Sequence, residues 1–178
     1  QYLQLRRVLA ESGCRYARAV TGSRVEIAGV LVRFFAPTRP LSMMDGPAPW
    51  PSGQPTGDEL NGSSLVAVAS VGEVDVLIPG DAEADVLGAY GLPSVEILVV
   101  PHHGSRGAVS NSLLERLGTE AACISVGAGN SFGHLDPATL ALLEERVPRV
   151  LRTDRSGWVS FTTDGDDVVL AMERGSDR

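Results

Sequence analysis

The alternation of apolar and polar positions predicts a mixture of helices and strands. Residues 3–12 carry leucine and valine at roughly helical intervals between arginines, which predicts an amphipathic helix. Residues 25–35 predict one or two strands with a glycine between them. The apolar runs 65–71 and 74–78 are separated only by a glycine and a glutamate, so we expect them to form a β-hairpin.

Strands and helices alternate in the second half of the chain. The predicted segments are strands at 95–100, 121–126, 149–152, 158–162 and 168–172, and helices at 82–90, 110–118 and 137–147. The hairpin followed by strand–helix–strand units predicts an α/β or α+β fold with a mixed sheet.

Residues 37–58 interrupt this pattern. They carry six prolines, which predicts a long, irregular and mobile loop. We otherwise expect residues 1–178 to form a single domain, since this length and an apolar content of 43% are sufficient for one sizeable core.

Composition and charge narrow the functional classes. The net charge is −7 and no basic tract stands out, so the overall charge does not favour nucleic-acid binding. No apolar stretch approaches the ~20 residues of a transmembrane helix. Cys14 and Cys123 are far apart in the sequence, which predicts neither a metal-binding cysteine pair nor a disulfide framework.

Side chains that can bind a metal ion or transfer a proton follow three of the predicted buried strands. Asp81 follows the strand at 74–78, the adjacent His102 and His103 follow the next strand, and His134 lies in the loop after the third. The chain has only three histidines. If these strands are parallel neighbours, their loops meet at one edge of the sheet, where ligands bind in α/β proteins. Carboxylate oxygen and imidazole nitrogen are ligands for first-row metal ions.

Each of these residues also has a structural alternative. Asp81, after a glycine, has the pattern of a turn residue or a helix N-cap. His134 directly precedes a predicted helix start, with Asp136 as the cap and Pro137 at the first helical position. His103 could serve as a structural residue that supports a ligand. The shared position of the three loops favours the functional interpretation.

Four segments resemble the C-terminal metallo-β-lactamase-like domain of ComEC-type competence proteins, which internalise DNA. They are LIPGD, EILVVPHHGS, ISVGAGNSFGHLDP and VLRTDRSGWVSFTTDG, and the resemblance runs from about residue 61 to about residue 164. The family fold is a four-layer αββα sandwich with mixed sheets and a metal site at one edge. The resemblance implies that fold here, incomplete at its N-terminus.

The resemblance also implies roles for individual residues. Asp81 matches the carboxylate that commonly bridges two metal ions. His102 matches a late histidine ligand and His103 a substrate-facing acid or base, although the two roles could be reversed. Asn61 stands where many relatives have another histidine ligand, and His134 matches a loop residue that faces the substrate phosphate.

Residues around the double histidine complete the expected substrate site. Gly104 would leave room for a substrate beside Ser105. Arg106 would contact a phosphate, or else extend into solvent as an ordinary loop arginine. The expected cofactor is divalent, Mn²⁺ or Zn²⁺, with up to two ions in a complete domain.

The family's main ligand cluster, H-x-[HD]-x-D-H, does not occur in the chain, and no histidine precedes His102. We expect the chain to begin just after that cluster in a longer protein; the alternative is a lineage that lost it. In either case the 178 residues hold at most half of a two-metal site. A chain with half a site can remain without a bound metal ion.

The implied function is metal-dependent cleavage of DNA phosphodiesters during uptake for natural competence. That activity would belong to the complete domain, and we expect this chain alone to be inactive. The alternative is a non-catalytic module of a membrane DNA transporter. A third possibility, hydrolysis of small esters or lactams, rests on superfamily membership alone.

The expected partners are DNA and the transmembrane channel portion of the same polypeptide. The resemblance places the domain on a bacterial cytoplasmic membrane protein, and we favour its extracytoplasmic face, where incoming DNA arrives. The sequence indicates no oligomeric state.

Overall fold

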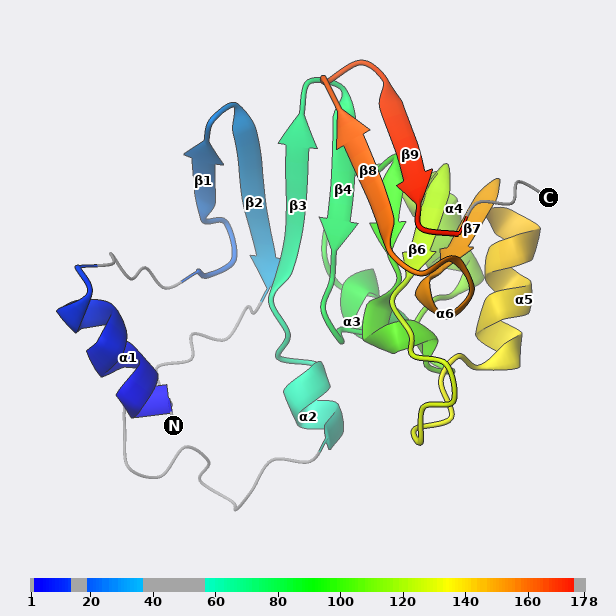
Figure 1. Ribbon diagram of the computed structural model, residues 1–178, viewed down its shortest axis with the longest axis horizontal. Coiled ribbons are helices and arrows are strands. Elements are labelled where there is room, and N and C mark those ends of the chain that lie inside the picture. The colour runs from blue at the N-terminus through cyan, green and yellow to red at the C-terminus, as the bar shows by residue number, and fades with distance from the viewer. Residues whose placement is uncertain (1, 14–18, 37–56, 175–178) are drawn as a thin grey trace.

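A computed structural model describes residues 2–13, 19–36 and 57–174. Its main element is a seven-stranded mixed sheet in the order β1-β2-β3-β4-β5-β6-β7 (Figure 1). The strands are β1 (Arg24–Ile27), β2 (Val30–Ala36), β3 (Val66–Val71), β4 (Val74–Ile78), β5 (Ile97–Val99), β6 (Ala121–Ile124) and β7 (Arg149–Arg152). Strands β1 to β4 pair antiparallel, and β4 to β7 pair parallel.

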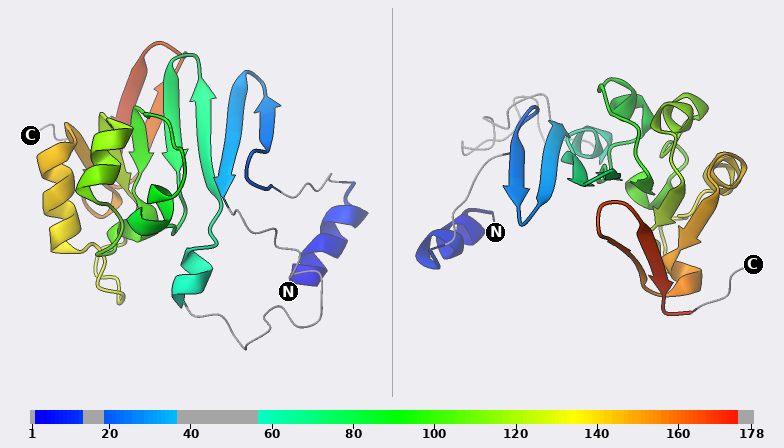
Figure 2. Two further views of the ribbon diagram at one scale, coloured as in Figure 1. Left: turned by 180° about the vertical axis from the view of Figure 1, so that it is seen from behind. Right: turned by 90° about the horizontal axis from the view of Figure 1, so that it is seen from above.

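Helices connect the parallel strands, as strand–helix–strand units require. The helical segments are α1 (Tyr2–Glu11), α2 (Gly57–Asn61), α3 (Ala84–Gly88), the turn η2 (Pro101–Gly104), α4 (Asn111–Leu117), α5 (Pro137–Arg146) and α6 (Thr153–Ser156). Helices α3 and α4 lie on one face of the parallel strands (Figure 2). No helix within the described ranges is long and apolar enough to cross a membrane.

A second, two-stranded sheet packs on the other face. It consists of β8 (Val159–Thr163) and β9 (Val168–Met172), which pair antiparallel. Figures 1 and 2 show this hairpin on the side of the main sheet opposite α3 and α4. Its turn touches the β3–β4 turn, where Glu73 N donates a hydrogen bond to Gly165 O at 2.7 Å.

Helices α4 and α5 have side-chain caps at their N-termini. Ser110 Oγ accepts a hydrogen bond from Leu113 N at the start of α4, and Gly118 ends that helix in the left-handed conformation. Asp136 caps α5 by accepting from backbone N–H groups of its first turn, and Pro137 occupies the first helical position. The predicted helix boundaries at glycine and proline are therefore confirmed.

The hydrophobic core lies between the parallel half of the sheet and its helices. Its fully buried large side chains include Leu77, Leu87, Leu98, Leu113, Leu117, Ile124 and Leu143. They come from β4, β5 and β6 of the parallel strands and from α3, α4 and α5, and Val150 of β7 packs against this cluster while partly buried. This burial fixes the strands beside one another and thereby fixes where their following loops emerge.

The structure confirms a mixed α/β fold with a mixed sheet. The helix predicted at 3–12, the hairpin at 65–78 and the strands near 149–172 are present, although the strand predicted at 95–100 shortens to Ile97–Val99. Of the loop predicted at 37–58, residues 37–56 lie outside the described ranges, and the last two residues belong to α2.

Candidate functional site

The three histidines come together at one edge of the sheet. Strands β4, β5 and β6 are parallel neighbours, so the loops that follow them emerge on the same side. The His102 and His134 ring centroids are 5.1 Å apart, and those of His103 and His134 are 6.2 Å apart. The predicted meeting of these loops is confirmed, and we call this region the histidine edge.

The double histidine has an unusual backbone conformation. His102 and His103 have φ values of 45° and 53°, in the left-handed region that non-glycine residues rarely adopt. Such a conformation costs on the order of 1–3 kcal/mol per residue and is found preferentially at functional sites. The turn is tied to the end of β4 through a hydrogen bond from His102 N to Gly80 O at 3.1 Å.

Glu83 orients His102, and sequence reasoning missed this residue. One Glu83 oxygen lies 2.8 Å from His102 Nδ1 and also accepts the hydrogen bond of the Ser105 hydroxyl. Because a carboxylate accepts hydrogen bonds, it favours the His102 tautomer that carries its proton on Nδ1. The Nε2 atom of a neutral His102 ring then keeps its lone pair for another partner. The signal in the sequence was an acidic residue two positions after Asp81.

His103 is oriented by a backbone carbonyl. Its Nδ1 lies 2.8 Å from Ser125 O, in the loop that follows β6. A carbonyl oxygen can only accept, so Nδ1 must carry the proton and Nε2 of the neutral ring is left as an acceptor. Histidines that bind metals or transfer protons commonly have one nitrogen fixed in this manner.

Asp81 and Asn61 share a separate cavity of about 220 Å³. Its lining residues are Asn61, Gly62, Asp81, Glu83, Asp85 and Val86. Asp81 N donates a hydrogen bond to Ser64 Oγ at 3.2 Å, which fixes the backbone after β4. The structure thus places Asn61 beside Asp81, and Glu83 joins their cavity to His102.

These residues supply suitable donor atoms for a divalent metal ion but not a complete ligand set. Within the described ranges, no three His, Cys, Asp or Glu side chains lie close enough to hold an ion together. The described residues therefore do not fit a metal ion by themselves. The roles of Asp81 and His102 as ligands stay predictions.

Gly104 and Ser105 are buried against other residues of the chain. Gly104 is buried with φ of 78°, and a Cβ atom there would collide with the Leu135 side chain. Ser105 is also buried; its hydroxyl donates to Glu83, and its carbonyl accepts from Thr139 Oγ1 at 2.7 Å. Both residues help to shape the turn, and their contact with a substrate stays a prediction.

Arg106 extends largely into solvent from the same turn. Its Nε donates to Asp136 Oδ2 at 3.2 Å, at the start of α5. Burial acts to raise the pKa of Asp136, but hydrogen bonds from Ala138 N, the Arg106 side chain and Thr139 N outweigh it and lower that pKa. The contact of Arg106 with a phosphate stays a prediction.

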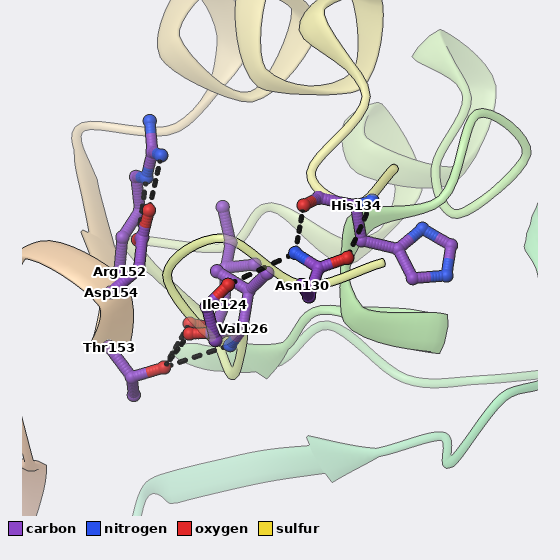
Figure 3. A network of polar contacts seen from close by, with 8 residues as sticks. Ile124, Val126, Asn130, His134, Arg152, Thr153 and Asp154 are labelled. Atoms are coloured by element: carbon purple, nitrogen blue, oxygen red, sulfur yellow. Dashed lines mark hydrogen bonds and ion pairs between the residues drawn. The ribbon is translucent and has the colours of Figure 1, made fainter. Parts of the chain in front are cut away.

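A polar network supports the loop on the far side of the edge (Figure 3). Thr153 Oγ1 accepts from Val126 N at 2.8 Å and lies 2.9 Å from Val126 O. Beside it, Arg152 donates two hydrogen bonds to Asp154, at 3.0 and 2.7 Å. The hydrogen bond from Arg152 is the largest cause of a lowered Asp154 pKa. Thr153, the first residue of the sequence TDRSG, therefore ties the loop after β6 to the start of α6.

Three curated proteins are similar to the chain, whereas no protein-family model matches it. ComE operon protein 3 of Bacillus subtilis is 32% identical over 105 residues, which cover 57% of this chain and 14% of that protein. Competence protein ComA of Neisseria gonorrhoeae is 34% identical over 107 residues, covering 57% and 15%. Recombination protein 2 of Haemophilus influenzae is 33% identical over 116 residues, covering 64% and 15%. The chain thus spans about one seventh of the length of these relatives.

Proposed function

We propose a function in DNA uptake from the homology of this chain to ComEC-type competence proteins. In this proposal the chain forms part of a hydrolase-like domain, and DNA meets the domain at the histidine edge. The observation that carries the proposal is the gathering of His102, His103 and His134 at the carboxyl ends of parallel strands. Two of these rings are fixed through Nδ1, which leaves Nε2 for an external partner.

The histidine edge has the chemistry to bind a phosphodiester. An imidazole can donate a hydrogen bond to a phosphate oxygen when protonated, and it can accept a proton from an attacking water when neutral. Arg106 adds a permanent positive charge nearby, with only its Nε engaged in the ion pair with Asp136. Both groups would hold the DNA backbone without reading its sequence.

We extend the proposal to metal-dependent cleavage within an αββα metallo-β-lactamase-like sandwich. A divalent ion, Mn²⁺ or Zn²⁺, would polarise the phosphoryl group and lower the pKa of a bound water. Asp81 and His102 are the ligands proposed from this chain, and further ligands would have to come from residues outside the described ranges. The transmembrane portion of the same polypeptide is the proposed partner, with the domain on the extracytoplasmic side.

A non-catalytic module of a DNA transporter is the second candidate. It is favoured by the absence, among the described residues, of any three side chains able to hold a metal ion together. In that case the edge would bind DNA without cleaving it. The two candidates differ in metal dependence, so metal binding and DNA binding are measured together.

Calorimetric titration of Mn²⁺ and Zn²⁺ into the 178-residue chain tests the proposed ligands. The variants are Asp81→Ala and His102→Ala, and the matched control is Glu26→Ala, an exposed carboxylate on β1 at the other side of the sheet. Binding that both site variants lose and the control keeps supports the hydrolase. No binding, together with retained affinity for DNA, favours the module. If the unaltered chain binds neither metal nor DNA, both candidates are overturned.

A further inference from the structure

A cavity of about 410 Å³ opens beside the histidine edge and differs in charge from its surroundings. Its lining residues are His103, Ser125, Val126, Gly127, Asn130, Phe132, His134 and Thr153. None is acidic, although the chain carries a net charge of −7. The cavity that contains Asp81 has three carboxylates, and a third cavity, at the opposite end of the parallel strands, has five. The cavity beside the histidines therefore has no carboxylate that would repel an anionic ligand.

Phe132 presents an aromatic face at the mouth of this cavity. Its side chain is 82% exposed, a larger fraction than for any other strongly exposed large apolar residue in the described ranges. The Phe132 and His134 rings are nearly parallel, with an interplanar angle of 15° and centroids 6.3 Å apart. Burying an exposed aromatic ring against a flat ligand is favourable, and offset stacking adds to that gain.

The loop that carries Phe132 is held by Asn130. The Asn130 side-chain oxygen accepts from Phe132 N at 3.1 Å and from His134 N at 3.2 Å. Its amide nitrogen donates to Gly127 O at 3.0 Å and to His134 O, as Figure 3 shows for the contacts with His134. One side chain thus closes the loop on both sides of Phe132. The backbone that carries Phe132 is preorganised, which reduces the entropy cost of binding a ligand.

We propose that this cavity binds an unpaired nucleobase, with Phe132 stacked on the base and His103 facing the adjoining sugar-phosphate. The inference rests on the proposed function in DNA uptake and specifies the form of DNA that the edge accepts. Every base has a π-face, so stacking on an aromatic side chain tolerates any sequence. In a duplex those faces are covered by neighbouring base pairs, so only a single strand or a frayed end can offer one. The lack of carboxylates in the lining suits a nucleotide and not a basic peptide.

Fluorescence anisotropy with labelled oligonucleotides tests the proposal. The probes are a short single strand of thymidines, a blunt duplex of two separate strands and an abasic strand with the same number of phosphates. The variants are Phe132→Ala, Phe132→Trp and the matched control Ile27→Ala, an exposed apolar side chain on β1. We expect Phe132→Ala to weaken binding of the thymidine strand by about 5- to 100-fold, the usual loss for one stacked base. Phe132→Trp should keep the affinity, and Ile27→Ala should not change it.

The abasic strand separates stacking from attraction to phosphate. The unaltered chain should bind it more weakly than the thymidine strand, and Phe132→Ala should cause no further loss. Equal binding of the two strands, or of the thymidine strand by the Phe132→Ala and unaltered chains, would overturn the stacking inference while leaving DNA binding in place. Failure of the unaltered chain to bind any of the three probes would overturn the proposed function as well.

Discussion

At the scale of single residues, one oxygen of Glu83 serves two neighbours, His102 Nδ1 and the Ser105 hydroxyl. Glu83→Ala would leave the buried Ser105 hydroxyl without this acceptor and free the His102 ring to rotate. Removing one partner of a buried hydrogen bond costs the remaining group its desolvation penalty. We therefore expect Glu83→Ala to lower the free energy of unfolding by about 1–3 kcal/mol, measured from the midpoint of urea denaturation.

Two substitutions serve as controls for Glu83. Glu83→Gln keeps an acceptor oxygen on a side chain of the same shape. It should therefore lower the free energy of unfolding clearly less than Glu83→Ala does. Glu145→Ala removes a carboxylate that is 68% exposed and should stay within about 0.5 kcal/mol of the unaltered chain. Equal stability of Glu83→Ala and Glu145→Ala would show that Glu83 does not support the turn.

Sequence reasoning located the histidines because strand order decides where they meet. An apolar run that ends in a polar loop is visible in the sequence, and parallel pairing then brings such loops together. The partners of those histidines were not visible. Glu83 and the Ser125 carbonyl reach His102 and His103 from 19 and 22 positions away, respectively, and only the folded chain shows which side chain or carbonyl is near. Phe132 escaped notice because an isolated aromatic residue in a loop has no periodic signal.

At the scale of elements, the pair formed by Arg152 and Asp154 joins the end of β7 to the first turn of α6. Their side chains are 16% and 17% exposed. The hydrogen bond from Arg152 is the main reason that the pKa of Asp154 lies below its ordinary value of 3.8. A carboxyl group whose pKa is lowered by folding stabilises the folded state above its unfolded pKa. That contribution is lost as the pH falls through the lower, folded pKa.

We accordingly expect Asp154→Asn to lower the free energy of unfolding by about 1–2 kcal/mol at neutral pH, a typical value for a charge-assisted pair. The difference between the two chains should shrink as the pH falls below about 4. Urea denaturation at a series of pH values measures it. In an Arg152→Met background the same substitution should cost much less, because the pair is already broken. A cost independent of both pH and Arg152 would contradict the assignment.

The sequence predicts the helix ends at glycine and proline better than it predicts the ends of the strands. Gly118 and Pro137 mark the end of α4 and the start of α5 because each residue restricts the backbone locally. The strand predicted at 95–100 is longer than β5 because the apolar run includes Val95 and Val100. Both residues are buried, but neither belongs to the strand. A run of apolar residues indicates which positions are buried, and buried positions extend beyond the residues that pair in the sheet.

At the scale of the whole molecule, charge is distributed unevenly between the two ends of the parallel strands. The cavity at the starts of β4 to β7, about 530 Å³ in volume, is lined by five carboxylates, whereas the cavity beside the histidines has none. A polyanion such as DNA would be repelled more strongly by the first cavity than by the second. The net charge of −7 is therefore unevenly spread. At the histidine edge the cavity lined by His103 and His134 carries none of these carboxylates, whereas the neighbouring cavity that contains Asp81 carries three.

The two sheets are joined where their turns touch, and Gly72 tests that junction. A Cβ atom on Gly72 would collide with the backbone of Gly165 in the β8–β9 turn, and backbone atoms cannot swing aside as a flexible side chain can. We expect Gly72→Ala to push the β8–β9 hairpin away from the main sheet. Overpacking of this kind costs typically about 1–3 kcal/mol. Urea denaturation measures the loss, and hydrogen exchange should show reduced protection in β8 and β9.

Gly29→Ala is the matched control for the strain of a positive φ. Gly29 also lies in a turn between antiparallel strands and has φ of 85°, against 54° for Gly72, but nothing lies within 4 Å of the position that its Cβ would take. It should therefore show only the backbone cost, with protection of β8 and β9 unchanged. Equal losses of stability for the two variants would mean that the contact with Gly165 does not hold the sheets together. A larger loss for Gly72→Ala, confined to the β8–β9 hairpin in the exchange pattern, would show that this turn contact fixes the second sheet against the first.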